Sequence, residues 1–132
     1  MKITYICLLI TGLMPILCTA IAKWGFKDFD NHNPRLWLSA QNGFRARANA
    51  AQSNCFEALP FFAISVGCAI AAQVNTQLLQ GSCILFVGLR LLYIVFYISD
   101  KATLRTLMWC SAYSCVIFNF VQAINVDRKS VV

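Results

Sequence analysis

The stretch RARANAAQSNCFEALPFF, residues 45–62, combines charged and amide side chains with the start of a long apolar run. After Glu57 the chain carries no charge until Arg90. A run of this length is typical of a membrane helix, because about 20 helical residues span the hydrocarbon core. Charged side chains are costly in lipid and indicate a functional site by default. The stretch therefore predicts a membrane helix whose polar side chains belong to a functional site.

The composition of the whole chain also indicates a membrane protein. Of the 132 residues, 59% are hydrophobic and 12% are charged, whereas about 25% of a soluble domain is charged. The mean hydropathy is +0.64. The net charge of +6 does not indicate nucleic-acid binding, because the basic residues lie between apolar segments and form no cluster with exposed aromatic residues. The length suggests one domain.

Four apolar segments can each cross a bilayer. Only helices and closed barrels satisfy their own backbone hydrogen bonds in lipid, so we expect each segment to be a helix. The predicted fold is an all-α, integral membrane four-helix bundle in which residues 1–132 form one domain. The expected spans are about residues 3–22, 44–72, 76–99 and 104–125.

The first segment has a second interpretation. Lys2, the apolar run and Ala20-Ile21-Ala22 resemble a cleavable signal peptide. The run of about 20 residues is longer than the usual 7–15 of such a peptide. A retained helix is therefore favoured.

The positions of the basic loops predict the orientation. Loops rich in lysine and arginine face the cytoplasm, so we expect residues 23–43 and 100–103 on that side. The uncharged connection at residues 73–77 would lie on the other side. With four spans, both termini would then also lie outside the cytoplasm.

All the cysteines fall within the apolar segments. Their number is odd, and no Cys-x-x-Cys or Cys/His spacing typical of a metal site is present. Cysteine packs well as a small apolar residue. We expect helix packing from these residues, with neither a structural disulfide nor a metal. They are Cys7, Cys18, Cys55, Cys68, Cys83, Cys110 and Cys115.

Polar side chains form a stripe on the second expected span. Each helical residue turns about 100°, so Arg47 and Asn54, which are seven residues apart, lie close to one face. Glu57 lies one turn further along the same side, and Pro60 ends the stripe. The stripe runs from the cytoplasmic end into the membrane.

A second stripe lies on the third span, where Arg90, Tyr93 and Tyr97 are spaced three and four apart. The two spans are antiparallel, so Arg90 and Glu57 are expected at similar depth, either paired or facing one wet cavity. Arg105 follows at the start of the fourth span.

Structural roles could explain each polar residue alone, through snorkelling, interhelical hydrogen bonds or interfacial aromatic rings. Together they favour a cleft that faces the cytoplasm. Arginine binds carboxylates through paired hydrogen bonds, and a single glutamate suits an ammonium group. The expected ligand is small, zwitterionic and anionic overall. Glutathione fits this description, and so do other anions.

Two motifs resemble the MAPEG family, the membrane-associated proteins in eicosanoid and glutathione metabolism. They are RANAAQSNCFEALPFF at residues 47–62 and RLLYIVFYISDKATLR at residues 90–105. The resemblance covers roughly residues 30–110. It implies homotrimers that bind glutathione, the co-substrate, between neighbouring subunits. The binding residues it implies are Arg47, Asn54, Glu57, Arg90, Tyr93 and Tyr97, and Arg105 would stabilise the thiolate.

One position departs from the family pattern. The eicosanoid-type enzymes carry an arginine four residues before the motif asparagine, where this chain has Ala50. One anchor for a glutathione carboxylate is therefore missing or displaced. The loop NHNPRLWLSAQNGFRARANAAQ, residues 31–52, is similar to small bacterial members, which implies a bacterial inner membrane.

The leading hypothesis is a glutathione transferase or peroxidase that acts on lipophilic electrophiles. A protein of the same fold that is a non-catalytic binding or scaffold partner is the first alternative. A small multidrug-type transporter, with four short helices and a membrane glutamate, is the second. Such a transporter is expected to carry its glutamate in the first span, where this chain has no acidic residue.

Overall fold

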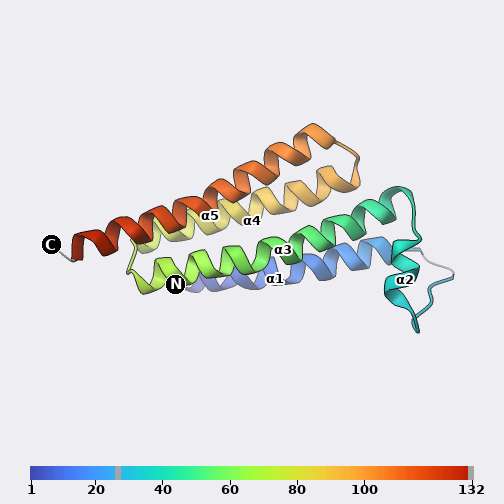
Figure 1. Ribbon diagram of the computed structural model, residues 1–132, viewed down its shortest axis with the longest axis horizontal. Helices are drawn as coiled ribbons and strands as arrows, with labels where there is room; N and C mark the ends of the chain where they lie inside the picture. Colours follow the sequence, from blue (N-terminus) through green and yellow to red (C-terminus); the bar gives the residue numbers. More distant parts are fainter. Residues whose placement is uncertain (26–27, 131–132) are drawn as a thin grey trace.

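The computed structural model describes residues 1–25 and 28–130, with side chains described as far as residue 126. The described chain is helical and contains no strand (Figure 1). The predicted all-α four-helix architecture is therefore confirmed. The helices are α1 (Lys2–Lys23), α2 (Pro34–Ser39), α3 (Gly43–Ala71), α4 (Thr76–Ile98) and α5 (Ala102–Ser130).

The four long helices are each long and apolar enough to cross a membrane. Large apolar side chains on their outer faces remain exposed, for example Leu9 at 62% and Ile64 at 57%. Such a surface would aggregate in water, whereas in a bilayer it contacts lipid. The chain is an integral membrane protein.

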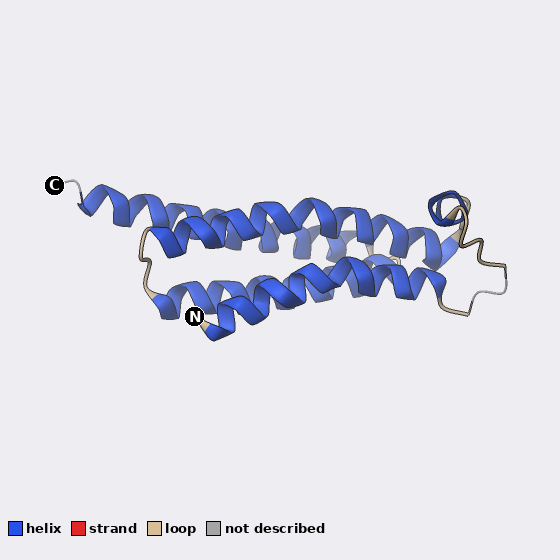
Figure 2. Ribbon diagram, turned by 90° about the horizontal axis from the view of Figure 1, so that it is seen from below, coloured by secondary structure: helices blue, strands red, loops and turns tan. Residues whose placement is uncertain are grey.

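The long helices form two antiparallel pairs. α1 packs against α3, and α4 packs against α5, and each pair runs along the long axis of the molecule (Figures 1 and 2). Further contacts of α3 with α5 and of α1 with α4 join the pairs. α2 lies at the same end as the turn between α4 and α5, and the α3–α4 connection lies at the opposite end (Figure 1).

The core combines small residues with one large aromatic contact. Phe62 and Phe86 are fully buried and stack with ring centroids 3.9 Å apart. Small residues elsewhere let the helices approach closely. Of the cysteines, five are buried, as predicted, but Cys68 and Cys110 are exposed. The packing prediction is wrong for these two, because their positions on α3 and α5 turn toward the outer surface of the chain.

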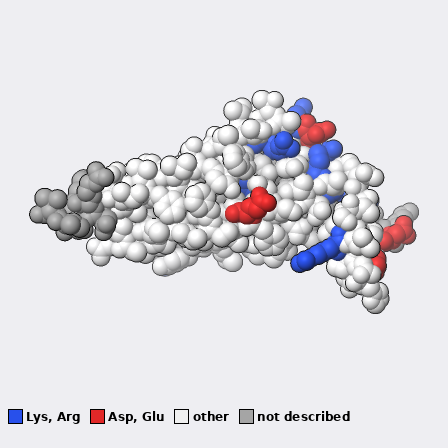
Figure 3. All heavy atoms as spheres, in the orientation of Figure 1, with Lys and Arg blue, Asp and Glu red and all other residues white. Residues whose placement is uncertain are grey.

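Charged side chains gather at the end of the molecule that carries α2. Figure 3 shows basic and acidic side chains there and one acidic patch near the middle of the molecule, whereas the described atoms in the other half of this face carry no charge. The described residues of the loop at 23–43 and the turn at 100–103 share this end (Figure 1). The sequence predicted that these two basic connections lie on the same side of the membrane, and their position at one end of the bundle agrees with that prediction. The assignment of this end to the cytoplasm stays a prediction.

Hydrogen bonds within the loop order the residues before α2. Asp30 accepts a hydrogen bond from the backbone N–H of His32 at 2.8 Å and another from the side-chain amide of Asn33 at 3.2 Å. These donors hold the pKa of the Asp30 carboxyl below its usual value. Pro34 then begins α2, where its missing N–H costs no helical hydrogen bond.

Candidate functional site

Arg90 lies deep in α4, and its side chain is fully buried. Its Nη1 donates to Oδ1 of Asn54 on α3 at 2.9 Å, and its Nη2 donates to Sγ of Cys55 at 3.4 Å. Its guanidinium carbon lies 4.3 Å from the centroid of the Tyr93 ring. An amide, a thiol and an aromatic ring therefore hold a charge that would be very costly in lipid alone.

Asn54 connects Arg90 to Glu57. Its Nδ2 donates to Oε2 of Glu57 at 3.2 Å. The one ion pair among the described residues involves neither Arg90 nor Glu57. The two charged side chains are therefore linked only indirectly, because each forms a hydrogen bond with the amide of Asn54. Glu57 is exposed, because one further turn of α3 carries its side chain to the surface while Arg90 stays inside the bundle.

A hollow of about 260 Å³ opens beside this hydrogen-bonded chain. Arg105 lies over the Tyr97 ring at 4.5 Å, and the Tyr97 ring meets that of Tyr93 edge-on at 5.5 Å. In the described part of the chain the Arg105 guanidinium donates to no acceptor. Its N–H groups can therefore bind an anion. The lining residues are Asn54, Tyr93, Tyr97, Arg105, Thr106 and Trp109.

Arg47 lies outside this hollow. Its Nε donates to the backbone oxygen of Ile98 at 3.0 Å, and its Nη1 lies 3.7 Å from Oδ2 of Asp100. A cation at a helix C-terminus is favourable because the last carbonyl groups carry partial negative charge. Arg47 thus joins α3 to the end of α4. The other predicted site residues lie together in the structure. Asn54, Tyr93, Tyr97 and Arg105 line the hollow, and Arg90 and Glu57 are joined to it through Asn54.

Two of the lining residues were missed by the sequence analysis. Thr106 and Trp109 follow Arg105 on α5 by one and four residues. The helical spacing of Trp109 from Arg105 was the available signal. Trp109 also contacts Tyr113, with ring centroids 4.5 Å apart, so aromatic side chains follow one another along α5 beside the hollow.

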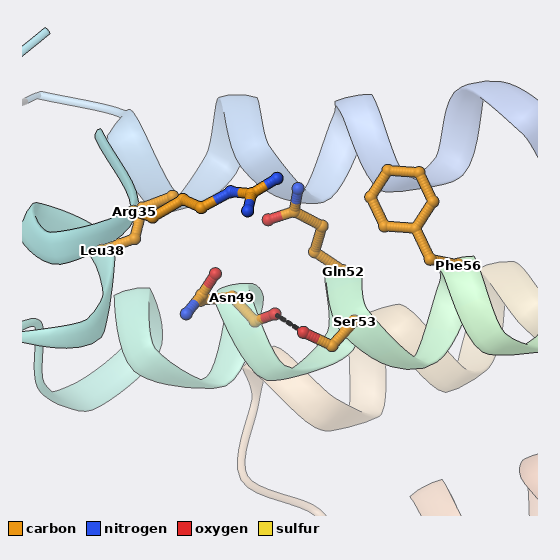
Figure 4. A pocket seen from close by; sticks show the side chains of 6 residues that line it. All are labelled: Arg35, Leu38, Asn49, Gln52, Ser53 and Phe56. Carbon is orange, nitrogen blue, oxygen red and sulfur yellow. Dashed lines mark hydrogen bonds between the residues drawn. The ribbon is translucent and has the colours of Figure 1, made fainter. Parts of the chain in front are cut away.

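A second hollow, of about 330 Å³, lies between α2 and α3 (Figure 4). Figure 4 shows the Arg35 guanidinium directed toward the amide of Gln52. No acceptor for the Arg35 side chain is present among the described residues. The hollow therefore presents an unpaired guanidinium and two primary amides. It is lined by Arg35, Leu38, Asn49, Gln52, Ser53 and Phe56.

The second hollow was not predicted from the sequence. Gln52 lies about 160° around α3 from Asn54, so the two hollows use opposite faces of one helix. The polar stripe predicted from the sequence covers only the face of Asn54. Arg35 was counted as a loop charge, and its position beside α3 depends on the fold of the short helix α2.

The fold and the site together define a four-span membrane protein with a hydrogen-bonded arginine, Arg90, buried among its helices. The model of the MAPEG family matches residues 3–125. The chain belongs to the MAPEG family. Neither the curated proteins nor the solved structures returned a match to it.

Proposed function

We propose that this protein binds glutathione at the hollow beside Arg105 and uses it against lipophilic electrophiles. The observation that carries the proposal is the Arg105 guanidinium, which lines the hollow and has no protein acceptor in the described chain. A cation beside a thiol favours the thiolate, which is the nucleophilic form. Arg105 is therefore the residue that we assign to the glutathione sulfur.

The other polar groups suit the rest of the tripeptide. Glutathione carries one ammonium and two carboxylate groups besides its thiol. The exposed carboxylate of Glu57 suits the ammonium group, and Asn54 and Tyr97 can hydrogen-bond to the peptide. Arg90 and Arg47 already bond to groups of the protein. The chain by itself therefore offers few free donors for the carboxylates.

We propose that a neighbouring copy of the chain supplies the missing donors in a homotrimer. In a ring of copies, each interface joins two different surfaces of the subunit. The hollows around Arg105 and Arg35 lie on opposite sides of α3, which suits such an arrangement. Arg35 and Gln52 of one copy would bind a carboxylate held beside Arg105 of the next. This would compensate for Ala50, where the family pattern has arginine.

The electrophile would arrive from the lipid along the aromatic surface of Trp109 and Tyr113. The thiolate then attacks the electrophilic carbon, and the leaving group departs toward water. We place this chemistry at the cytosolic face of a bacterial inner membrane, where reduced glutathione is available. A scaffold protein that binds glutathione without turnover is the alternative.

The test is conjugation of glutathione to a chloronitroaromatic by the detergent-purified protein. We expect Arg105→Ala to lower the rate at least about tenfold, which corresponds to about 1.4 kcal/mol of lost thiolate stabilisation. Arg45→Ala is the matched control, because Arg45 also lies over a ring, that of Phe44 at 5.5 Å, but donates to Trp24 outside the hollow.

Calorimetry with glutathione separates the remaining outcomes. Binding that Arg105→Ala weakens, without turnover, supports the scaffold protein. Absence of both binding and turnover in the folded trimer removes glutathione from the proposal. Equal rates for Arg105→Ala and Arg45→Ala remove Arg105 from the mechanism.

A further inference from the structure

Two buried cysteines meet where α1 packs against α3. Cys18 and Cys55 are 0% and 2% exposed, and their thiol groups are close neighbours. Nη2 of Arg90 donates to Sγ of Cys55 at 3.4 Å. A cation that contacts a thiol favours the thiolate, which is the reactive form of cysteine.

The charge of Arg90 has no anion in direct contact. In the part of the chain that the structure describes, its guanidinium contacts an amide, a thiol and a ring. Glu57 is reached only through Asn54. A buried charge without an opposite charge is strongly unfavourable. A thiolate at Cys55 would supply the anion at hydrogen-bonding distance, so this sulfur is well placed to carry negative charge.

We propose that Cys18 and Cys55 form a redox-active pair that a small hydroperoxide oxidises to a disulfide between α1 and α3. The Cys55 thiolate attacks one peroxide oxygen, so that an S–O bond forms, the O–O bond breaks and hydroxide leaves as water after taking a proton. The Cys18 sulfur then attacks Sγ of Cys55. The S–S bond forms, the S–O bond breaks, and the Cys18 proton leaves with the oxygen as a second water.

The location of the pair selects a small oxidant. Cys55 is almost completely buried, but the adjacent Asn54 lines the open hollow of about 260 Å³. Hydrogen peroxide is the smallest peroxide, so it needs the smallest opening beside Asn54 to reach the sulfur. The two electrons that reduce the peroxide come from the two thiols, so no further reactant is needed. A dithiol reductant returns the pair to its starting state.

The chain contains its own control for this chemistry. Cys83 is also buried and lies near Cys7 and Cys115, but among the described residues no arginine donates a hydrogen bond to it, in contrast to Cys55. If burial and a neighbouring thiol were sufficient, Cys83 would be oxidised as readily as Cys55. If contact with Arg90 matters, Cys55 reacts first.

The experiment uses the full-length protein in lipid nanodiscs with Cys68 and Cys110, the exposed thiols, replaced by serine. Hydrogen peroxide is added for increasing times, and the remaining thiols are alkylated after denaturation. Mass spectrometry then measures linked and alkylated peptides. We expect a Cys18–Cys55 linked peptide that dithiothreitol removes, formed at least about tenfold faster than any product at Cys83, because the charged donor acts only on Cys55.

Two variants make the result decisive. In Cys18→Ser the second step is blocked, so dimedone added together with the denaturant should trap a sulfenic acid at Cys55. Cys83→Ser should leave the linked peptide unchanged. Absence of the linked peptide in protein with unchanged circular dichroism, or equal rates at Cys55 and Cys83, would overturn the proposal. Since no glutathione is present, the result is independent of the proposed function.

Discussion

The amide of Asn54 links the buried charge of Arg90 to the exposed charge of Glu57, so its removal tests the energetics of the site. Asn54→Ala deletes the oxygen 2.9 Å from Nη1 of Arg90. A hydrogen bond to a charged group contributes about 1.5–3 kcal/mol to stability. We therefore expect Asn54→Ala to lower the free energy of unfolding by about that amount.

The bundle offers a neutral bond for comparison. Nδ2 of the buried Asn119 donates to Oγ of Ser65 at 3.4 Å. Hydrogen bonds between membrane helices average only about 0.6 kcal/mol in double-mutant cycles. Two cycles should therefore differ. Asn54→Ala with Arg90→Met should give a coupling energy of at least about 1.5 kcal/mol, and Asn119→Ala with Ser65→Ala about 0.6 kcal/mol.

The assay is reversible unfolding in mixed micelles with increasing dodecyl sulfate, followed by far-ultraviolet circular dichroism. The cycle separates the pairwise energy from the packing that each alanine removes. A coupling energy for Asn54 and Arg90 no larger than that for Asn119 and Ser65 would refute the reasoning. In that case the charge of Arg90 would be stabilised by water or lipid and not by the network.

Three further predictions concern the rim of the bundle. Trimers mixed from equal amounts of Arg35→Ala and Arg105→Ala subunits should regain glutathione binding at about a quarter of the sites. The reason is that each site takes its two arginines from different copies, and half of the copies carry each arginine. Calorimetry that detects no recovery excludes a shared site. Arg47→Ala should speed hydrogen exchange at residues 98–101, where its side chain bonds to the end of α4, while exchange near Arg90 stays unchanged. The pKa of Asp30 is lowered in the folded loop, so its stabilising contribution should be present at neutral pH and be lost as the pH falls through that lowered pKa; carboxyl NMR should show that Asp30 titrates at a lower pH in the folded protein than in the unfolded chain.

The helices could be predicted because their length and apolarity are local properties of the sequence. The expected span at residues 44–72 corresponds to α3 (Gly43–Ala71), and that at 76–99 corresponds to α4 (Thr76–Ile98). α2 was not predicted, because six residues are too few to give a hydropathy signal. Pro34 at its first turn was the one cue, since proline favours that position.

The site could be predicted only one helix at a time. Spacing placed Asn54 and Glu57 on one side of α3, and the structure joins them by a hydrogen bond. The partners across helices depend on how each helix is rotated about its axis, which spacing does not define. For this reason Arg47 was assigned to the cleft, although it bonds to the end of α4. Cys55 was assigned to packing alone, although it contacts Arg90.

Four of the six arginines divide into two groups, and the division bears on assembly. Arg90 and Arg47 bond to acceptors within the chain, whereas Arg105 and Arg35 have none among the described residues. A cation without a protein acceptor favours the binding of an anion. Because Arg35 and Arg105 line hollows on opposite faces of α3, one anion could be bound by Arg105 of one subunit and Arg35 of its neighbour. Ligand binding and trimer formation would then strengthen each other, because each requires the other to complete its contacts. Glutathione should therefore shift the subunit equilibrium toward the trimer at low protein concentration, and Arg35→Ala should abolish that shift while the four-helix fold remains.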